Sequence, residues 1–124
     1  MAKPFVAVLY RENDIYQEAV QALDSRLGRV ESASRAFPFD HTDYYLAEMG
    51  HGLLRRFISL EHLVLPLWLV EAKCDLVTLE ATFTGKHGRR INLDPGVLDG
   101  GKVVLASGKA APQKLYLDRG VFAD

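Results

Sequence analysis

Hydrophobic and polar residues follow two different periods along this chain, and these periods predict where its strands and helices lie. Residues 4–10 are a continuous apolar run, which is typical of a strand buried on both faces. Residues 55–63 alternate with a period of two, so Arg56, Ile58 and Leu60 share one face of a second strand. The half-polar segment 29–37 predicts a weaker strand, and segments 89–95 and 102–108 predict two short ones.

The first predicted helix follows the turn at residues 11–14. Asn13 or Asp14 can cap its N-terminus, and Gly28 ends it after about Leu27. Its inward stripe has the three-and-four spacing of an amphipathic helix and consists of Ile15, Ala19, Leu23 and Leu27.

The second predicted helix has Pro66 in its first turn, where the missing N–H of proline costs nothing. Its apolar stripe consists of Leu69, Ala72, Leu76, Leu79 and Phe83. We expect this stripe to face a sheet that contains Val6 and Val8, with Glu71 and Lys73 in water.

The order of these elements predicts the fold class. Strand, helix, strand, strand, helix, strand is the order of an α+β, ferredoxin-like split βαβ sandwich, a mainly antiparallel sheet with two helices on one face. Residues 114–124 predict an appended C-terminal hairpin that turns at residues 118–120, and residues 38–52 predict a loop or a broken helix. The chain contains no repeat or linker, so residues 1–124 are expected to form a single domain.

Residues 96–102 match most of a phosphate-binding P-loop, because Gly96 is followed at the right spacing by Gly101 and Lys102. Val103 stands where a P-loop needs a hydroxyl, and Pro95 removes an N–H where donors are needed. The two valines at 103 and 104 favour a strand rather than the start of a helix. We therefore expect residues 96–104 to form a hairpin loop.

Residues 37–57 hold the densest group of chemically active side chains: Asp40, His41, Asp43, Tyr44, Tyr45, Glu48 and His51. Three interpretations remain open. His41, Asp43 and Glu48 are candidate ligands for a divalent metal, and His41 with Asp43 also suits acid–base catalysis. Alternatively, the segment is structural, with Asp40 or Thr42 capping a helical turn and the tyrosines packing on the sheet.

Composition narrows the classes of partner. The net charge of −1 gives no field that would attract nucleic acid or an anionic membrane, so neither is expected as a partner. No apolar stretch is long enough to span a bilayer, and the N-terminal apolar run ends at Arg11, too early for a signal sequence. Cys74 is the only cysteine, which fits a reducing cytoplasm. We expect a cytoplasmic protein.

Five segments together resemble one known family: FPFDHTDYY, EMG, LLRRFISLE, GRRINLDPG and KVVLAS. They are similar to the prokaryotic family called domain of unknown function 4416 (DUF4416), over nearly the whole chain. The resemblance implies a single cytoplasmic domain with no established activity. Some members carry a GTP-binding label, although no motif supports it. Members usually extend beyond the point where this chain ends, so C-terminal strands of the family are expected to be missing here.

The resemblance marks residues 40–45 and several later positions: Arg56, Arg90, Asn92, Asp94, Gly96, Lys102 and Ser107. Carboxylates, a histidine and basic groups of this kind suit a small anionic ligand. We therefore expect a polar cleft between the Asp40–Tyr45 loop and a turn at Asn92–Gly96, with Tyr44, Tyr45 and Lys102 among its binding residues. An alternative is that Arg56 and Arg90 only pair with Asp43 and Asp94 across strands.

Two further classes of function stay open. One is a hydrolase that uses His41 and Asp43, with or without a divalent metal. The other is a GTP-binding or assembly protein, for which a homodimer would be one form.

Overall fold

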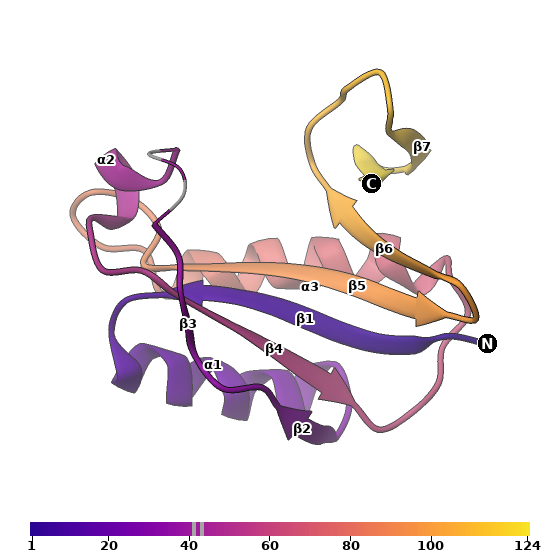
Figure 1. The fold of residues 1–124 in the computed structure, drawn as a ribbon, viewed down its shortest axis with the longest axis horizontal. Coiled ribbons are helices and arrows are strands. Elements are labelled where there is room, and N and C mark those ends of the chain that lie inside the picture. Colours follow the sequence, from indigo (N-terminus) through magenta and orange to yellow (C-terminus); the bar gives the residue numbers. More distant parts are fainter. Residues whose placement is uncertain (41, 43) are drawn as a thin grey trace.

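An eight-stranded sheet with three helices is formed by the part of the chain that the computed structural model describes, residues 1–40, 42 and 44–124 (Figure 1). The strands pair antiparallel in the order β2-β4-β1-β5-β6-β8-β7, with β3 beside β4. Their bounds are β1 Lys3–Tyr10, β2 Val30–Ala33, β3 Phe37–Pro38, β4 Leu54–Leu60, β5 Ile91–Asp99, β6 Lys102–Ser107, β7 Leu115–Asp118 and β8 Val121–Ala123. The helices are α1 Asn13–Arg26, α2 Leu46–Met49 and α3 Trp68–Thr82.

Both long helices lie where the apolar spacing predicts them, but they begin differently from the prediction. Glu12 is the N-cap of α1, in place of Asn13 or Asp14, and it makes no capping bond through its side chain. The N-cap of α3 is Leu67, so Pro66 precedes the helix rather than lying in its first turn. The carbonyl of Pro66 accepts the N–H of Leu69 at 3.1 Å.

The half-polar segment 29–37 forms two short strands instead of one. β2 and β3 both pair with β4, and Ser34 lies between them. The hydroxyl of Ser34 accepts the N–H of Phe57 at 2.9 Å, which replaces a bond of the ladder where the strand is interrupted. The following segment contains one helical turn, α2, which agrees with the predicted broken helix.

The main core lies between the sheet and both long helices. Val6, Val8 and Tyr10 of β1 belong to one buried cluster with the inward stripe of α1 and with Leu76 and Leu79 of α3. The stripe residues Leu69, Ala72, Leu76 and Leu79 are all buried, as predicted. Lys73 was expected in water, but it is only 9% exposed.

β5 is longer than the sequence predicts, and the expected turn at Asn92–Gly96 is wrong. These residues pair with Leu9 through Phe5 of β1 in an unbroken register. The N–H of Leu93 points away from β1, toward α3. Because backbone groups alternate along a strand, the nitrogen of Pro95, two residues further along, also points away from β1. β6 pairs with β5 only from Gly96 onward, and therefore Pro95 removes no bond of the ladder.

Residues 96–104 do form a hairpin, but most of them belong to its strands rather than to a loop. β5 and β6 are joined through Gly100 and Gly101, with Asp99 opposite Lys102, and no helix begins at Lys102. Packing requires a glycine at position 96, because a Cβ there would collide with the ring of Phe5 on β1. This P-loop match therefore lacks the strand-to-helix geometry that a phosphate cradle needs.

Beyond this hairpin β6 diverges from β5 and pairs with β8, which forms the predicted C-terminal hairpin with β7 (Figure 1). Arg119 and Gly120 join these two strands with φ values of 48° and 77°, as a two-residue type I′ turn requires. Among the described residues, no helix is both long and apolar enough to cross a membrane.

Candidate functional site

The first half of β5 has a strand on one side only. β1 pairs with β5 from Leu98 to Ile91, whereas β6 covers it no further than Gly96. Part of the free edge is covered by α3, where Glu80 accepts the N–H of Leu93 at 2.7 Å. The divergence of β6 from β5 thus opens a space beside the edge of the sheet.

This space is a cleft of about 610 Å³, which we call the β5-edge cleft. Its walls come from the segment before α2, helix α3, Arg89 with the free half of β5, the end of β6 with the segment that follows it, and Asp124 after β8. The lining residues are Tyr44, Tyr45, Lys73, Val77, Glu80, Arg89, Asn92, Asp94, Leu105, Ala106, Ser107, Gly108, Lys109, Lys114 and Asp124.

A chain of hydrogen bonds connects the polar groups contributed by β5 and α3. Lys73 forms an ion pair with Asp94 at 2.8 Å, and Asn92 donates to the other Asp94 oxygen, also at 2.8 Å. Arg89 in turn donates to the Asn92 side-chain oxygen at 2.7 Å. Both oxygens of Asp94 are therefore occupied by donors from the protein.

Arg89 also holds two glutamates. Its guanidinium and its backbone N–H both donate hydrogen bonds to the Glu48 carboxylate, with lengths of 2.9–3.2 Å. Its Nη1 also lies 3.5 Å from a carboxylate oxygen of Glu80. The hydrogen bonds from Arg89 lower the pKa of Glu48. Burial raises the pKa of Glu80, although the Leu93 N–H, Lys73 and Arg89 partly oppose the effect.

The opposite wall of the cleft carries two lysines. Lys114 donates to the Ser107 hydroxyl at 2.9 Å and to the Lys109 carbonyl at 3.0 Å, and its nearest carboxylate oxygen, on Asp124, is 3.9 Å away. The Lys109 ammonium lies 3.8 Å from the centre of the Tyr44 ring. Within the described part of the chain, no carboxylate forms an ion pair with Lys109.

Tyr45 lies between the cleft and a small apolar cluster on the face of the sheet opposite the long helices. Its ring meets those of Phe39 and Tyr44 edge to face, and it packs against a cluster of Leu9, Met49 and Leu53. Burial and the Asp94 charge both raise the pKa of its phenol. The hydroxyl therefore stays protonated at neutral pH and can act as a donor.

Four of the residues that the sequence predicts as ligand-binding line this cleft: Tyr44, Tyr45, Asn92 and Asp94. The two segments of the predicted site do meet there, although the second is a strand rather than a turn. His41 and Asp43, the candidate catalytic and metal-binding pair, lie outside the described residues. Their proximity to Asn92 and Asp94 stays a prediction.

The other predicted residues lie elsewhere. Asp40 is exposed beside a separate hollow of about 90 Å³, and Lys102 is at the β5–β6 turn. Arg56 donates to the Tyr10 hydroxyl at 2.8 Å and covers the ring of Tyr16. Arg90 forms an ion pair with Glu12, so the alternative pairing of Arg90 with Asp94 is wrong.

Glu48 was a candidate metal ligand, and its carboxylate is held by Arg89. Among the described residues, no group of three or more histidine, cysteine, aspartate or glutamate side chains is arranged to hold a metal ion.

The sequence interpretation missed several cleft residues, namely Lys73, Glu80, Arg89, Lys109 and Lys114. Two of them could have been recognised from their spacing in the sequence. Lys73 and Glu80 follow Leu69 at the same three-and-four spacing as Leu76, so they lie on the buried stripe of α3. Charged residues on a buried stripe indicate paired charges.

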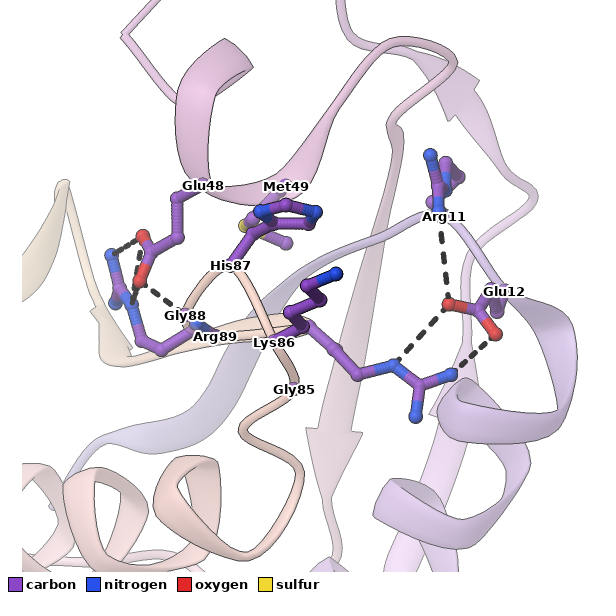
Figure 2. A pocket seen from close by; sticks show the side chains of 10 residues that line it. Arg11, Glu12, Glu48, Met49, Gly85, Lys86, His87, Gly88 and Arg89 are labelled. Atoms are coloured by element: carbon purple, nitrogen blue, oxygen red, sulfur yellow. Dashed lines mark hydrogen bonds and ion pairs between the residues drawn. The ribbon is translucent and has the colours of Figure 1, made fainter.

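A second hollow, of about 140 Å³, lies next to Glu48 and is shown in Figure 2. It is lined by Arg11, Glu12, Glu48, Met49 and residues 85–90, and we call it the turn pocket. Arg89 points from the turn toward Glu48 (Figure 2). Arg90 instead forms an ion pair with Glu12. Arg89 lines both this pocket and the β5-edge cleft.

The fold and these two sites define an α+β domain with a polar cleft at the edge of its sheet. The chain belongs to the DUF4416 family, described as a domain of unknown function, whose sequence model matches residues 1–124. No curated protein and no solved structure matched the chain.

Proposed function

We propose that this protein is a small-molecule-binding domain that takes an anionic ligand in the β5-edge cleft. The proposal rests on one observation: within the described part of the chain, charged groups are paired on one side of the cleft, whereas a lysine is left without an acidic partner on the other. On the β5 and α3 side, the carboxylates already have basic partners: Asp94 pairs with Lys73, and Glu80 lies 3.5 Å from Arg89, which also pairs with Glu48. On the other side, Lys109 has no carboxylate partner among the described residues.

An incoming anion would therefore meet a positive charge that nothing in the described part of the protein compensates. The contact between Lys109 and the Tyr44 ring is a cation–π interaction, which contributes only about 0.5–1 kcal/mol at an exposed site. A carboxylate or phosphate oxygen makes a stronger, charge-assisted bond to the same ammonium. The Ser107 hydroxyl and Lys114 lie on the same wall and add donors.

The opposite wall would orient the rest of the ligand. Tyr45 offers a protonated hydroxyl, and Tyr44 offers an exposed ring. The paired ions of β5 and α3 are fixed before a ligand arrives, so binding would not have to order them. This combination suits a compact ligand with one anionic group and a polar or planar body.

We also infer that the fold is ferredoxin-like. The support is the order β2-β4-β1-β5 in the sheet, with α1 between β1 and β2 in the chain and α3 between β4 and β5. A cytoplasmic location remains part of the proposal, supported by a lone cysteine that can form no internal disulfide.

A thermal-shift screen of carboxylates, phosphates, amino acids and nucleotides tests the function. A ligand that binds only the folded state raises the melting temperature. We expect an anionic compound to do so, and we expect K109E to abolish the rise. K102E makes the same charge change on an exposed lysine outside the cleft, and it should retain the rise. An equal response of both variants, or no anionic ligand at all, would contradict the proposal.

A further inference from the structure

The turn that forms one wall of the turn pocket is anchored on both sides. Gly85 and Gly88 exchange backbone hydrogen bonds, at 2.8 and 3.3 Å. Beyond them, Arg89 is fixed to Glu48 of α2, and Arg90 is fixed to Glu12 at the start of α1. Residues 86 and 87 are therefore presented from a fixed backbone (Figure 2).

Gly88 is part of this anchoring. Its φ is +118°, which side chains rarely adopt, and a Cβ there would come within 2.8 Å of the Glu48 carboxylate. A larger residue would push Glu48 away from Arg89.

The positive charges of the pocket are not all neutralised. The two anchoring arginines are matched by the two glutamates, Glu48 and Glu12. Lys86 and His87, between them, have no acidic partner in the described part of the chain. The nearest carboxylate oxygen to Arg11 is 3.9 Å away, on Glu12, which already bonds to Arg90.

The basic side chains reach the pocket from two segments. Arg11 directly follows β1, whereas Lys86 and His87 come from the turn (Figure 2). The volume of about 140 Å³ is several times the roughly 30 Å³ of one water molecule, so a group of five heavy atoms fits. A tetrahedral dianion can accept from donors that approach from separate directions, whereas a planar carboxylate presents only two oxygens in one plane.

We propose that the turn pocket binds a phosphate group, either as inorganic phosphate or as a phosphate monoester. Lys86, His87 and Arg11 contact its oxygens, and the Arg89–Glu48 and Arg90–Glu12 pairs hold the walls. The site shares Arg89 with the β5-edge cleft but is distinct from it, because Arg11, Lys86 and His87 line only the turn pocket and Lys109 and Lys114 line only the cleft.

Calorimetric titration of the full chain with inorganic phosphate, and in parallel with phenyl phosphate, tests this site. Removing one charge-assisted contact should weaken binding at least about tenfold, so K86A is expected to show that loss and K86A with R11A a larger one. K102A, which removes an exposed lysine outside the pocket, should bind as the unaltered protein does. Tighter binding of phenyl phosphate would identify a monoester as the ligand, and tighter binding of phosphate would identify the free ion.

Backbone amide NMR shifts during the same titration locate the ligand. The proposal predicts shifts at residues 85–90. No binding, an equal loss in K86A and K102A, or equal binding of acetate would overturn it. Shifts confined to residues 105–109, abolished by K109E, would also overturn it and would support the β5-edge cleft instead. If the shifts at residues 85–90 persist in K109E and no ligand is found for the β5-edge cleft, the turn pocket is supported and the proposed function is contradicted.

Discussion

The charges of Lys73 and Asp94 should be strongly coupled in the folded state because the pair is partly shielded from water. Its side chains are 11% and 26% exposed, and the two charged atoms are 2.8 Å apart. Exposed pairs contribute about 0.2–1 kcal/mol, and breaking a fully buried pair costs about 3–5 kcal/mol. For this partly buried pair we expect a coupling free energy of about 1.5–3 kcal/mol, the range of hydrogen bonds to charged groups.

A double-mutant cycle measured by urea unfolding gives this coupling directly, from K73M, D94N and the double variant. The chain offers a matched control in Lys3 and Glu31, whose charged atoms are 2.7 Å apart but whose side chains are 30% and 45% exposed. The cycle of K3M with E31Q should give less than about 1 kcal/mol. Equal coupling in the two cycles would refute the argument from burial.

Three further changes test the packing and the buried charge. Leu76→Ala should lower the free energy of unfolding by about 2–5 kcal/mol, whereas Val77→Ala, at a residue 51% exposed on the same helix, should cost less than about 1 kcal/mol in urea unfolding. Gly96→Ala should lower the melting temperature by several degrees because of the collision described above, and Gly100→Ala, in open space, should not. The raised pKa of Glu80 means that the folded state holds this proton more tightly than the unfolded chain, so stability is lost as pH rises through the raised pKa. Glu80→Gln should therefore flatten the fall in unfolding free energy as the pH rises above the ordinary pKa of glutamate, about 4.3, and an unchanged pH profile would contradict this account.

The strands and long helices could be predicted from the sequence because each depends on local spacing. The run 4–10 and the alternation at 55–63 became β1 and β4, and the apolar stripes became α1 and α3. The turn predicted at Asn92–Gly96 is wrong because the local preference of proline and glycine for turns is overridden here by strand pairing. Pro95 is tolerated since its nitrogen faces the free edge of β5, and Gly96 is required by Phe5 of another strand.

The candidate site could be predicted only in part, for a similar reason. The sequence indicated that the tyrosines near residue 45 and the polar residues of β5 share a cleft, and they do. It did not identify the cations: the position of Lys73 on the buried stripe of α3 indicates a paired charge, but only the folded chain places Asp94 next to it. Lys109 enters the cleft only because β6 diverges from β5, which depends on how distant strands pair.

The most direct test of the proposed function is amide NMR mapping of the anionic compound that most raises the melting temperature. The account predicts that the largest shifts fall at residues 105–109 and 92–94, on both walls of the β5-edge cleft, and that they disappear in K109E but persist in K102E. Shifts confined to other surfaces, or shifts at the cleft that K109E leaves unchanged, would contradict it.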